Sequence, residues 1–308
     1  MTAPLPNRPS EVRAWCLARG FHPSRTLGQN FLVDGNTVDA IVAAAGVSAG
    51  ERVLEVGPGM GALTRSMLQA GALVTAIEKD MKLADLLRES LVSFGDAFSL
   101  HAMDMLKVSL DSLLATGDPA AASPDGAGMM PADMAAEPFF PKFVSNLPYS
   151  VGTRILIDVC RHPLAPRTCI VMVQKEVADR LAAPPGTPDR GQASVWIQRR
   201  YRVEIVRIVP PTCFWPKPEV SSAVVRLVRH DDFPLSDGEV SLFESITKTA
   251  FMHRRKQMAS IFRGAKMAGG VTVPDASRWL ASCGIPANAR PSDITMADWC
   301  ALARELGR

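Results

Sequence analysis

Short β-rich runs alternate with helical patterns along most of the chain, and this alternation is the feature that most constrains the fold. The seven runs are RVLEVG (52–57), LVTAIE (73–78), FSLHAMD (98–104), KFVSN (142–146), CIVMVQ (169–174), RVEIVRIV (202–209) and SAVVRLV (222–228). Such alternation is typical of βαβ units around a mostly parallel sheet, and the last two runs predict an antiparallel pair. The sequence therefore predicts an α/β fold.

The chain is long enough for one large domain and a smaller partner, since its 308 residues exceed a typical single core. After the last strand run, Leu242, Ile246 and Ala250 recur at helical spacing, so a helical C-terminal domain is expected. The predicted boundaries are 1–230 for the first domain, with an N-terminal segment 1–35 and a loop insertion 111–141, and 231–308 for the helical domain.

Local composition supports the insertion and the C-terminal helices. Residues 111–141 are dominated by Ala, Gly, Pro, Ser and Met without a helical or strand period over most of their length, which indicates a loop. DASRWLASCG follows Pro274 and closes at Gly284, as a short helix does. SDITMADWCALAREL predicts another helix with a Ser or Asp cap.

Composition excludes several classes of protein. With 47% hydrophobic and 21% charged residues, the chain should fold as a globular protein. Its six cysteines form no CxxC pair, so neither a metal site nor a disulfide framework is expected. No apolar run approaches the ~20 residues of a membrane span, and the N-terminus lacks a secretory h-region. A cytoplasmic protein without membrane association is expected.

A glycine-rich loop follows the first strand run. VLEVGPGMGALT places Gly57, Gly59 and Gly61 between a buried strand and a helical pattern. Glycine is needed where the backbone turns sharply or where a Cβ would collide with a ligand, so such loops lie against nucleotide cofactors. A GxGxG pattern alone is weak evidence for a cofactor site, because a tight turn without a ligand gives the same pattern.

Two acidic residues end the next two strands. Glu78 follows Gly61 by 17 residues, where a carboxylate can accept hydrogen bonds from both hydroxyls of a ribose. Asp104 ends the third strand, where it could accept a hydrogen bond from an adenine amine. Ligands of open α/β sheets bind at the carboxyl ends of strands, so the three features together predict a nucleotide site. A nicotinamide-dependent oxidoreductase remains possible at this point.

The fourth strand run leads into Asn146, Leu147, Pro148 and Tyr149. The amine of adenine is a poor nucleophile because its lone pair is delocalised into the ring. The Asn146 side-chain oxygen and the Leu147 carbonyl could accept its hydrogens and favour a tetrahedral nitrogen, with Pro148 fixing the carbonyl direction. Tyr149 offers a face on which the base can stack, and Phe214 could close the other face. This motif favours chemistry on adenine over hydride transfer.

With these residues the chain resembles the KsgA/Dim1 family of ribosomal RNA adenine N6,N6-dimethyltransferases. The resemblance is dense from Leu27 to about Leu227 and resumes over the C-terminal third. It implies a Rossmann-like class I methyltransferase sheet of seven mostly parallel strands. The motifs that carry it are LGQNFL (27–32), VLEVGPGMGALT (53–64), NLPY (146–149), VMVQKEVADRL (171–181), GQASVWIQ (191–198), FWPKPEVSSAVVRL (214–227), AFMHRRKQM (250–258) and GIPANARPSDIT (284–295).

The resemblance also implies a cofactor and a substrate. The cofactor would be S-adenosyl-L-methionine, with S-adenosyl-L-homocysteine as product, and the substrate two adjacent adenosines in a hairpin near the 3′ end of 16S rRNA in the immature small subunit. A monomer is expected. The residues implied to bind the cofactor are Asn30, Leu32, Gly57, Gly59, Glu78, Asp104 and Asn146. Those implied to form the target-adenine pocket are Asn146, Leu147, Pro148, Tyr149 and Phe214.

Two basic clusters are candidates for RNA contact. Arg199 and Arg200 follow one helical pattern, and Arg254, Arg255 and Lys256 follow another. Such clusters can neutralise phosphates, although a charge run is as often a solvated helix face. The resemblance favours the second cluster, even though its RRKQMASIF differs from the RRKTLRNSL that is more typical of the family.

Two alternatives remain open. The chain could be an RNA-binding assembly factor of the small subunit whose catalysis is secondary. It could also be an adenine methyltransferase of large-subunit RNA or of DNA. The intact Gly-rich loop, Glu78, Asp104 and NLPY argue against a protein without catalysis, and FWPKPEV with the GIPANARPSDIT tail favours small-subunit RNA.

Overall fold

The computed structural model describes residues 8–24, 27–120, 138–273 and 275–307. These residues pack into two compact units. The sheet unit comprises Met1–Ala178 and Glu204–Arg229, and the helical unit comprises Asp179–Val203 and His230–Arg308. The helical unit thus contains residues 179–203 in addition to the C-terminal helices that the sequence predicts.

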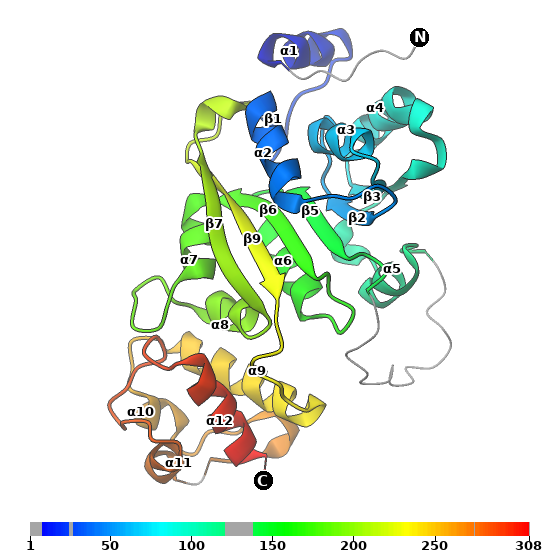
Figure 1. Cartoon of the computed structure of the whole chain (residues 1–308). Coiled ribbons are helices and arrows are strands. Elements are labelled where there is room, and N and C mark those ends of the chain that lie inside the picture. The colour runs from blue at the N-terminus through cyan, green and yellow to red at the C-terminus, as the bar shows by residue number, and fades with distance from the viewer. Residues whose placement is uncertain (1–7, 25–26, 121–137, 274, 308) are drawn as a thin grey trace. The chain divides into compact units, whose positions relative to one another are not determined.

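A seven-stranded sheet forms the centre of the sheet unit (Figure 1), with strand order β4-β3-β2-β5-β6-β9-β7. A separate two-stranded sheet pairs β1 with β8. The strands are β1 (Phe31–Leu32), β2 (Arg52–Val56), β3 (Leu73–Glu78), β4 (Phe98–Ala102), β5 (Lys142–Asn146), β6 (Thr168–Gln174), β7 (Tyr201–Val209), β8 (Phe214–Trp215) and β9 (Ser222–Arg229).

The predicted α/β class and all seven predicted strands are confirmed. Strands β2 to β6 pair in parallel, and β9 runs antiparallel to β6, with Ser222 opposite Gln174 and Val228 opposite Thr168. Strand β9 thereby lies between β6 and β7. The chain order of the last two strands is therefore reversed in space, and β7 forms the edge of the sheet.

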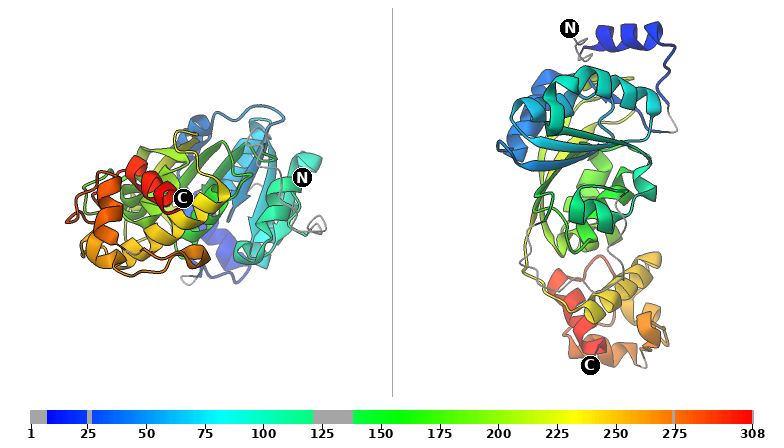
Figure 2. Two further views of the ribbon diagram at one scale, coloured as in Figure 1. Left: turned by 90° about the horizontal axis from the view of Figure 1, so that it is seen from below. Right: turned by 90° about the vertical axis from the view of Figure 1, so that its right-hand side faces the viewer.

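Helices cover both faces of this sheet (Figures 1 and 2). Apolar side chains of α2, α3 and α4 form one core cluster with Val53, Val74, Val144 and Ile170 of the sheet. Helix α6 packs on the opposite face, because the Cys160 Sγ lies 3.9 Å from the Sγ of Cys169, whose side chain alternates with that of Ile170. Helices of the sheet unit are α1 (Pro9–Ala18), α2 (Gly35–Ala45), α3 (Ala62–Gln69), α4 (Met81–Leu91), α5 (Leu110–Thr116) and α6 (Gly152–Arg161), with 3₁₀ turns η1 (Val92–Ala97), η2 (Met105–Lys107) and η3 (Pro211–Cys213).

The prediction of a loop over 111–141 is wrong at its start. Helix α5 covers Leu110–Thr116, because the Ser109 hydroxyl caps it by accepting from the Ser112 N–H, and Gly117 ends it in the left-handed conformation. Leu113 and Leu114 are buried, so this short helix of seven residues anchors the segment. The part of the predicted insertion from 121 to 137 lies outside the described residues.

The helical unit buries a core built around Phe243, Ile246 and Trp299. Helix α8 joins it from the middle of the chain, and the Trp196 Nε1 donates to the Thr247 Oγ1 at 2.9 Å. Across the described parts of the chain, no helix has the length and apolarity that crossing a membrane requires. The remaining helices are α7 (Lys175–Ala182), α8 (Gln192–Gln198), α9 (Asp237–Met252), α10 (Met258–Phe262), α11 (Ala276–Ser282) and α12 (Met296–Leu306), with the 3₁₀ turn η4 (Ala268–Gly270).

The caps of the last two helices explain where they begin. Asp275 caps α11 by accepting from the Arg278 N–H, within the predicted helix-start pattern. The expected Ser or Asp cap of α12 is wrong, because Thr295 occupies that position. Its hydroxyl and the Asp298 carboxylate form a reciprocal capping box, which satisfies two backbone donors at once.

Candidate functional site

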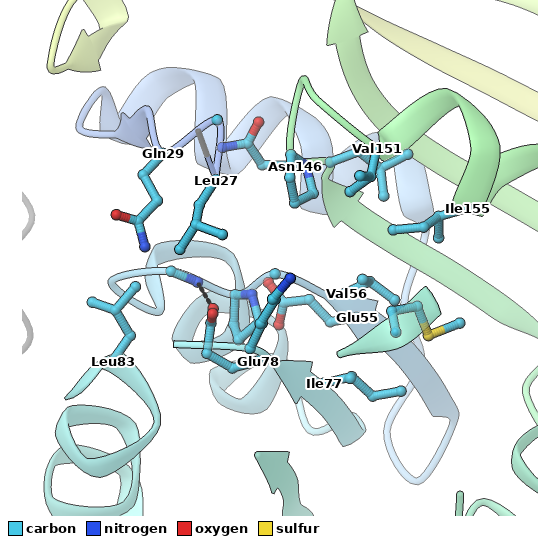
Figure 3. A pocket seen from close by; sticks show the side chains of 18 of the residues that line it. Leu27, Gln29, Glu55, Val56, Ile77, Glu78, Leu83, Asn146, Val151 and Ile155 are labelled. Carbon is cyan, nitrogen blue, oxygen red and sulfur yellow. Dashed lines mark hydrogen bonds between the residues drawn. The ribbon is translucent and has the colours of Figure 1, made fainter. Parts of the chain in front are cut away.

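A pocket opens at the carboxyl ends of β2, β3 and β5 in the sheet unit, and Figure 3 shows it from close by. It encloses about 1100 Å³ of space, including the part that is open to solvent. Asn146 and Leu27 point into it from one side, and Glu55 and Glu78 from the other. The residues predicted to bind the cofactor all line it, as do Leu147, Pro148 and Tyr149. The pocket thus brings together the cofactor and catalytic motifs.

Gly57 links the two motifs physically. Its φ of +68° is a left-handed conformation, and a Cβ at this position would lie 3.1 Å from the Pro148 Cγ. Only glycine accommodates both the backbone conformation and this close approach. The glycine-rich loop after β2 therefore lies directly against the NLPY loop after β5.

Glu78 ends β3 with its carboxylate inside the pocket. Its Oε2 accepts from the Gly59 N–H at 3.2 Å, and its Oε1 accepts from the Asp80 N–H at 2.8 Å. Burial raises the pKa of this carboxyl to about 7, while the backbone donors act in the opposite direction. Each carboxylate oxygen retains a further lone pair, so the pair of oxygens can accept from two hydroxyls of a ribose.

Asp104 follows β4 and is held by two donors. The Lys79 Nζ lies 2.9 Å from its Oδ2, and the Leu106 N–H donates to its Oδ1 at 3.0 Å. The hydrogen bond from Lys79, followed by that from Leu106, lowers the pKa of Asp104 below its ordinary value. An ionised carboxylate at this place can accept a hydrogen bond from the amine of an adenine ring.

The N-terminal segment closes one side of the pocket through Gln29 and Asn30. The Gln29 Nε2 donates to the Asp80 Oδ2 at 3.0 Å, and the Ser24 N–H donates to the Gln29 Oε1 at 2.7 Å. Next to it, the backbone carbonyl of Asn30 accepts from the Asn146 Nδ2 at 3.3 Å. Segment 27–32 therefore connects the end of β3 with the end of β5 across the pocket.

The contact with Asn30 also orients the catalytic amide. Because the Asn146 Nδ2 donates to a backbone carbonyl, the opposite end of the amide, Oδ1, is the end that serves as an acceptor. Asn146 sits at the last position of β5, and the Leu147 N–H continues the ladder by donating to the Met172 carbonyl at 3.1 Å. The acceptor is thus carried by a rigid strand end.

Phe214 and Tyr149 differ in their surroundings. Tyr149 lines the pocket and is partly buried. Phe214 does not line it, because its side chain is buried in the core cluster of the sheet unit and its backbone pairs with Leu32. Its predicted contact with a target base remains a prediction.

Glu55 is a pocket residue that the sequence reasoning missed. It lies inside β2, is 1% exposed, and accepts a hydrogen bond from the Thr64 Oγ1 at 2.7 Å. Burial raises the pKa of its carboxyl to about 8. A carboxylate in the middle of a buried strand directly before a glycine-rich loop is the sequence signal that could have found it, since such a group is costly without a role.

We expect Glu55 to make stability depend on pH. Between its ordinary pKa of about 4.3 and its folded value of about 8, the folded chain holds a proton that the unfolded chain has lost. The free energy of unfolding therefore falls as pH rises through this window, by on the order of 1 kcal/mol per pH unit at most. Glu55→Gln removes this dependence of stability on pH. The melting temperature of the variant minus that of the unmodified protein should therefore increase as pH increases. An unchanged difference between about pH 5 and about pH 8.5 would show that Glu55 is already ionised.

The predicted RNA-contact residues all lie in the helical unit. Arg254, Arg255 and Lys256 are exposed after the end of α9, where the Arg254 guanidinium also donates to the Pro188 carbonyl. Arg199 and Arg200 are half-buried at the end of α8, and the Arg199 guanidinium lies 5.6 Å from the centre of the Phe243 ring. The first three are therefore better disposed to meet phosphates than the last two.

The lining of the pocket fits S-adenosyl-L-methionine chemically. It combines apolar side chains such as Ile77 and Met105 with a few fixed carboxylates. Glu78 can accept from ribose hydroxyls and Asp104 from an adenine amine.

Comparison with known proteins gives a consistent result. The family model described as Ribosomal RNA adenine dimethylase matches residues 20–306. "Ribosomal RNA small subunit methyltransferase A" of Geobacillus thermodenitrificans is 34% identical over 302 residues, covering 98% of this chain and 96% of that protein. The protein of the same name from Magnetococcus marinus is 35% identical over 288 residues, covering 92% of each.

Solved structures confirm the fold. A dimethyladenosine transferase from Plasmodium falciparum superposes with a TM-score of 0.67 at 19% identity, covering 87% of this chain and 94% of that one. The 23S rRNA methyltransferase ErmE gives a TM-score of 0.61 at 24% identity, covering 91% and 100%. The sheet is thus that of a class I methyltransferase. From the match along nearly its whole length, the chain belongs to the ribosomal RNA adenine dimethylase family and is an S-adenosylmethionine-dependent methyltransferase of adenine in ribosomal RNA.

Proposed function

We propose that this enzyme dimethylates N6 of two adjacent adenosines in a hairpin near the 3′ end of 16S rRNA, in the immature small ribosomal subunit. The names of the relatives at 34% and 35% identity, which refer to the small subunit, support this substrate. The observation that carries the chemistry is the contact between the two loops, since Gly57 abuts Pro148 and so joins cofactor and target motifs in one pocket.

The proposed reaction depends on how Asn146 and Leu147 hold the target amine. In the first transfer the Asn146 Oδ1 and the Leu147 carbonyl accept hydrogen bonds from the two N6 hydrogens, and in the second transfer one of them accepts from the single hydrogen that remains. These bonds shift the nitrogen toward a tetrahedral geometry and free its lone pair, and the nitrogen loses one proton to solvent with each methyl group that it gains. Bound S-adenosyl-L-methionine supplies an electrophilic methyl group on its sulfonium. Most of the acceleration comes from positioning and electrostatics.

Different residues of the pocket bind different parts of S-adenosyl-L-methionine. Glu78 takes the ribose and Asp104 the adenine, and the backbone around Asn30, Leu32, Gly57 and Gly59 closes around the remainder. Tyr149 stacks against the target base.

We also propose a location and an oligomeric state. A ribosomal substrate favours a cytoplasmic location. The enzyme is proposed to act as a monomer.

We expect Arg255 and Lys256 to contribute to RNA affinity. Their charge reversal, Arg255→Glu with Lys256→Glu, should weaken binding of small subunits about 10- to 100-fold and flatten the dependence of log affinity on log salt by about 1.5 to 2. A filter-binding titration at several salt concentrations measures both. The matched control is Arg278→Glu, an exposed residue on α11 of the same unit. Equal losses of affinity in the charge-reversal variant and in Arg278→Glu would show that Arg255 and Lys256 have no specific role in RNA binding.

Transfer of labelled methyl groups to purified substrates tests the proposed function. The substrates are immature small subunits whose 16S rRNA lacks dimethyladenosine, naked large-subunit RNA and DNA. We expect label in the small subunits alone, recovered as dimethyladenosine after digestion. Label in the large-subunit RNA or in DNA would show that this nucleic acid is the substrate instead. Binding of small subunits without transfer would favour an assembly factor.

A further inference from the structure

The hydroxyl of Tyr149 is held by a residue outside the pocket. Its Oη lies 2.5 Å from the Oγ of Ser222, which belongs to β9 and is 73 positions further along the chain. Tyr149 lines the pocket, whereas Ser222 does not. The hydrogen bond with Tyr149 therefore connects Ser222 to the pocket.

Ser222 is a rigid anchor. It is 0% exposed, and its strand is paired with β6 from Ser222, opposite Gln174, to Val228, opposite Thr168. Strand β9 lies inside the sheet, between β6 and β7, so it has hydrogen-bonded neighbours on both sides. A buried hydroxyl in such a place costs free energy unless it has a partner, and the Tyr149 hydroxyl provides one.

The backbone of Tyr149 is fixed independently of its hydroxyl. The Gly152 N–H donates to the Pro148 carbonyl at 2.7 Å and closes a tight turn around Tyr149. On the other side Gly28 approaches so closely that a Cβ there would lie 3.0 Å from the Tyr149 nitrogen. With both its main chain and its Oη held, the ring has almost no freedom to tilt.

We propose that Ser222 is a positioning residue that sets the plane of the Tyr149 ring for stacking with the target adenine. The inference rests on the proposed function, in which Tyr149 receives that base. Stacking on an aromatic face depends on the angle and offset of the two rings, so a fixed plane reduces the ordering needed when the base arrives. Burial raises the pKa of Tyr149, so its phenol stays protonated and the contact with Ser222 joins two neutral hydroxyls.

A double-mutant cycle tests this role. Ser222→Ala and Tyr149→Phe each remove one hydroxyl of the pair, and the double variant removes both. Methyl transfer to immature small subunits should show a kcat/KM that is about 5- to 10-fold lower in each single variant. The double variant should be no worse than either single one, because both act through the same contact. Affinity for S-adenosyl-L-homocysteine should change less than about twofold in all three.

Two controls separate positioning from loss of fold. Ser221→Ala changes the neighbouring, half-buried serine, and its kcat/KM should match the unmodified enzyme. Melting temperatures of all variants show how much each substitution destabilises the sheet unit. A structural defect would lower melting temperature and cofactor affinity together, whereas loss of positioning lowers kcat/KM alone.

The possible outcomes of the cycle test the role of Ser222 and the proposed substrate separately. Equal losses that do not add support the role of Ser222. If Ser222→Ala retains full kcat/KM, or if its loss adds to that of Tyr149→Phe, Ser222 does not act through the tyrosine hydroxyl. If the unmodified enzyme transfers no methyl to small subunits, the proposed substrate fails and the inference fails with it.

Discussion

Replacing Asn146 by alanine should lower kcat by about 100- to 1000-fold and leave no measurable dimethyladenosine in the product. The substitution removes the Oδ1 acceptor, which is the end of the amide opposite the donor to the Asn30 carbonyl and the proposed partner of the target amine. Because the proposed RNA-contact cluster lies in the helical unit, affinity for small subunits should stay within about threefold. Single-turnover methyl transfer at saturating cofactor measures the loss, and filter binding measures the affinity.

The matched control for this prediction is Asn36→Ala. Asn36 is exposed in the first turn of α2 and does not line the pocket, so its variant should be fully active. If Asn146→Ala kept more than a tenth of the normal kcat, the amine would be activated by other groups, and the NLPY loop would lose its assigned role.

Replacing Glu78 by alanine should raise the dissociation constant of S-adenosyl-L-homocysteine by about 100-fold or more. Two hydrogen bonds from ribose hydroxyls to a charged acceptor are together worth about 3 kcal/mol. The loss also leaves the N–H groups of Gly59 and Asp80 without their acceptor, which loosens the glycine-rich loop. Isothermal titration calorimetry with the purified chain measures the change directly.

Glu89→Ala provides the comparison, since Glu89 is exposed on α4 and away from the pocket. Its dissociation constant should equal that of the unmodified protein. A Glu78→Ala protein that binds within about fivefold of normal would mean that the ribose is held elsewhere, and the assignment of the strand-end carboxylates would have to be revised.

The sequence predicted the sheet unit well because its signals are local. Each strand run is a short apolar stretch with turn residues at its ends, and the glycine loop, Glu78, Asp104 and NLPY all stand directly after such a stretch. Because parallel strands bring their carboxyl ends to one edge, finding the strands was enough to gather these residues. The structure places them in one pocket as expected.

Features that depend on distant pairing could not be predicted in the same way. Strand β9 lies between β6 and β7. Hydrophobic pattern alone does not specify which strands become neighbours in a sheet. The contact between Tyr149 and Ser222 joins residues far apart in sequence for the same reason. Helix α8 packs with the helical unit through Trp196, whose partner Thr247 lies 51 residues away.

Nucleoside analysis of 16S rRNA in a bacterial strain without its own small-subunit dimethyladenosine tests the central claim most directly. The strain would express either this protein or its Asn146→Ala variant, and the dimethylated positions would be mapped by primer extension. The account predicts two adjacent N6,N6-dimethyladenosines in the hairpin near the 3′ end with the unmodified protein and none with the variant. An unmethylated hairpin in cells that contain the folded, cofactor-binding protein would contradict it.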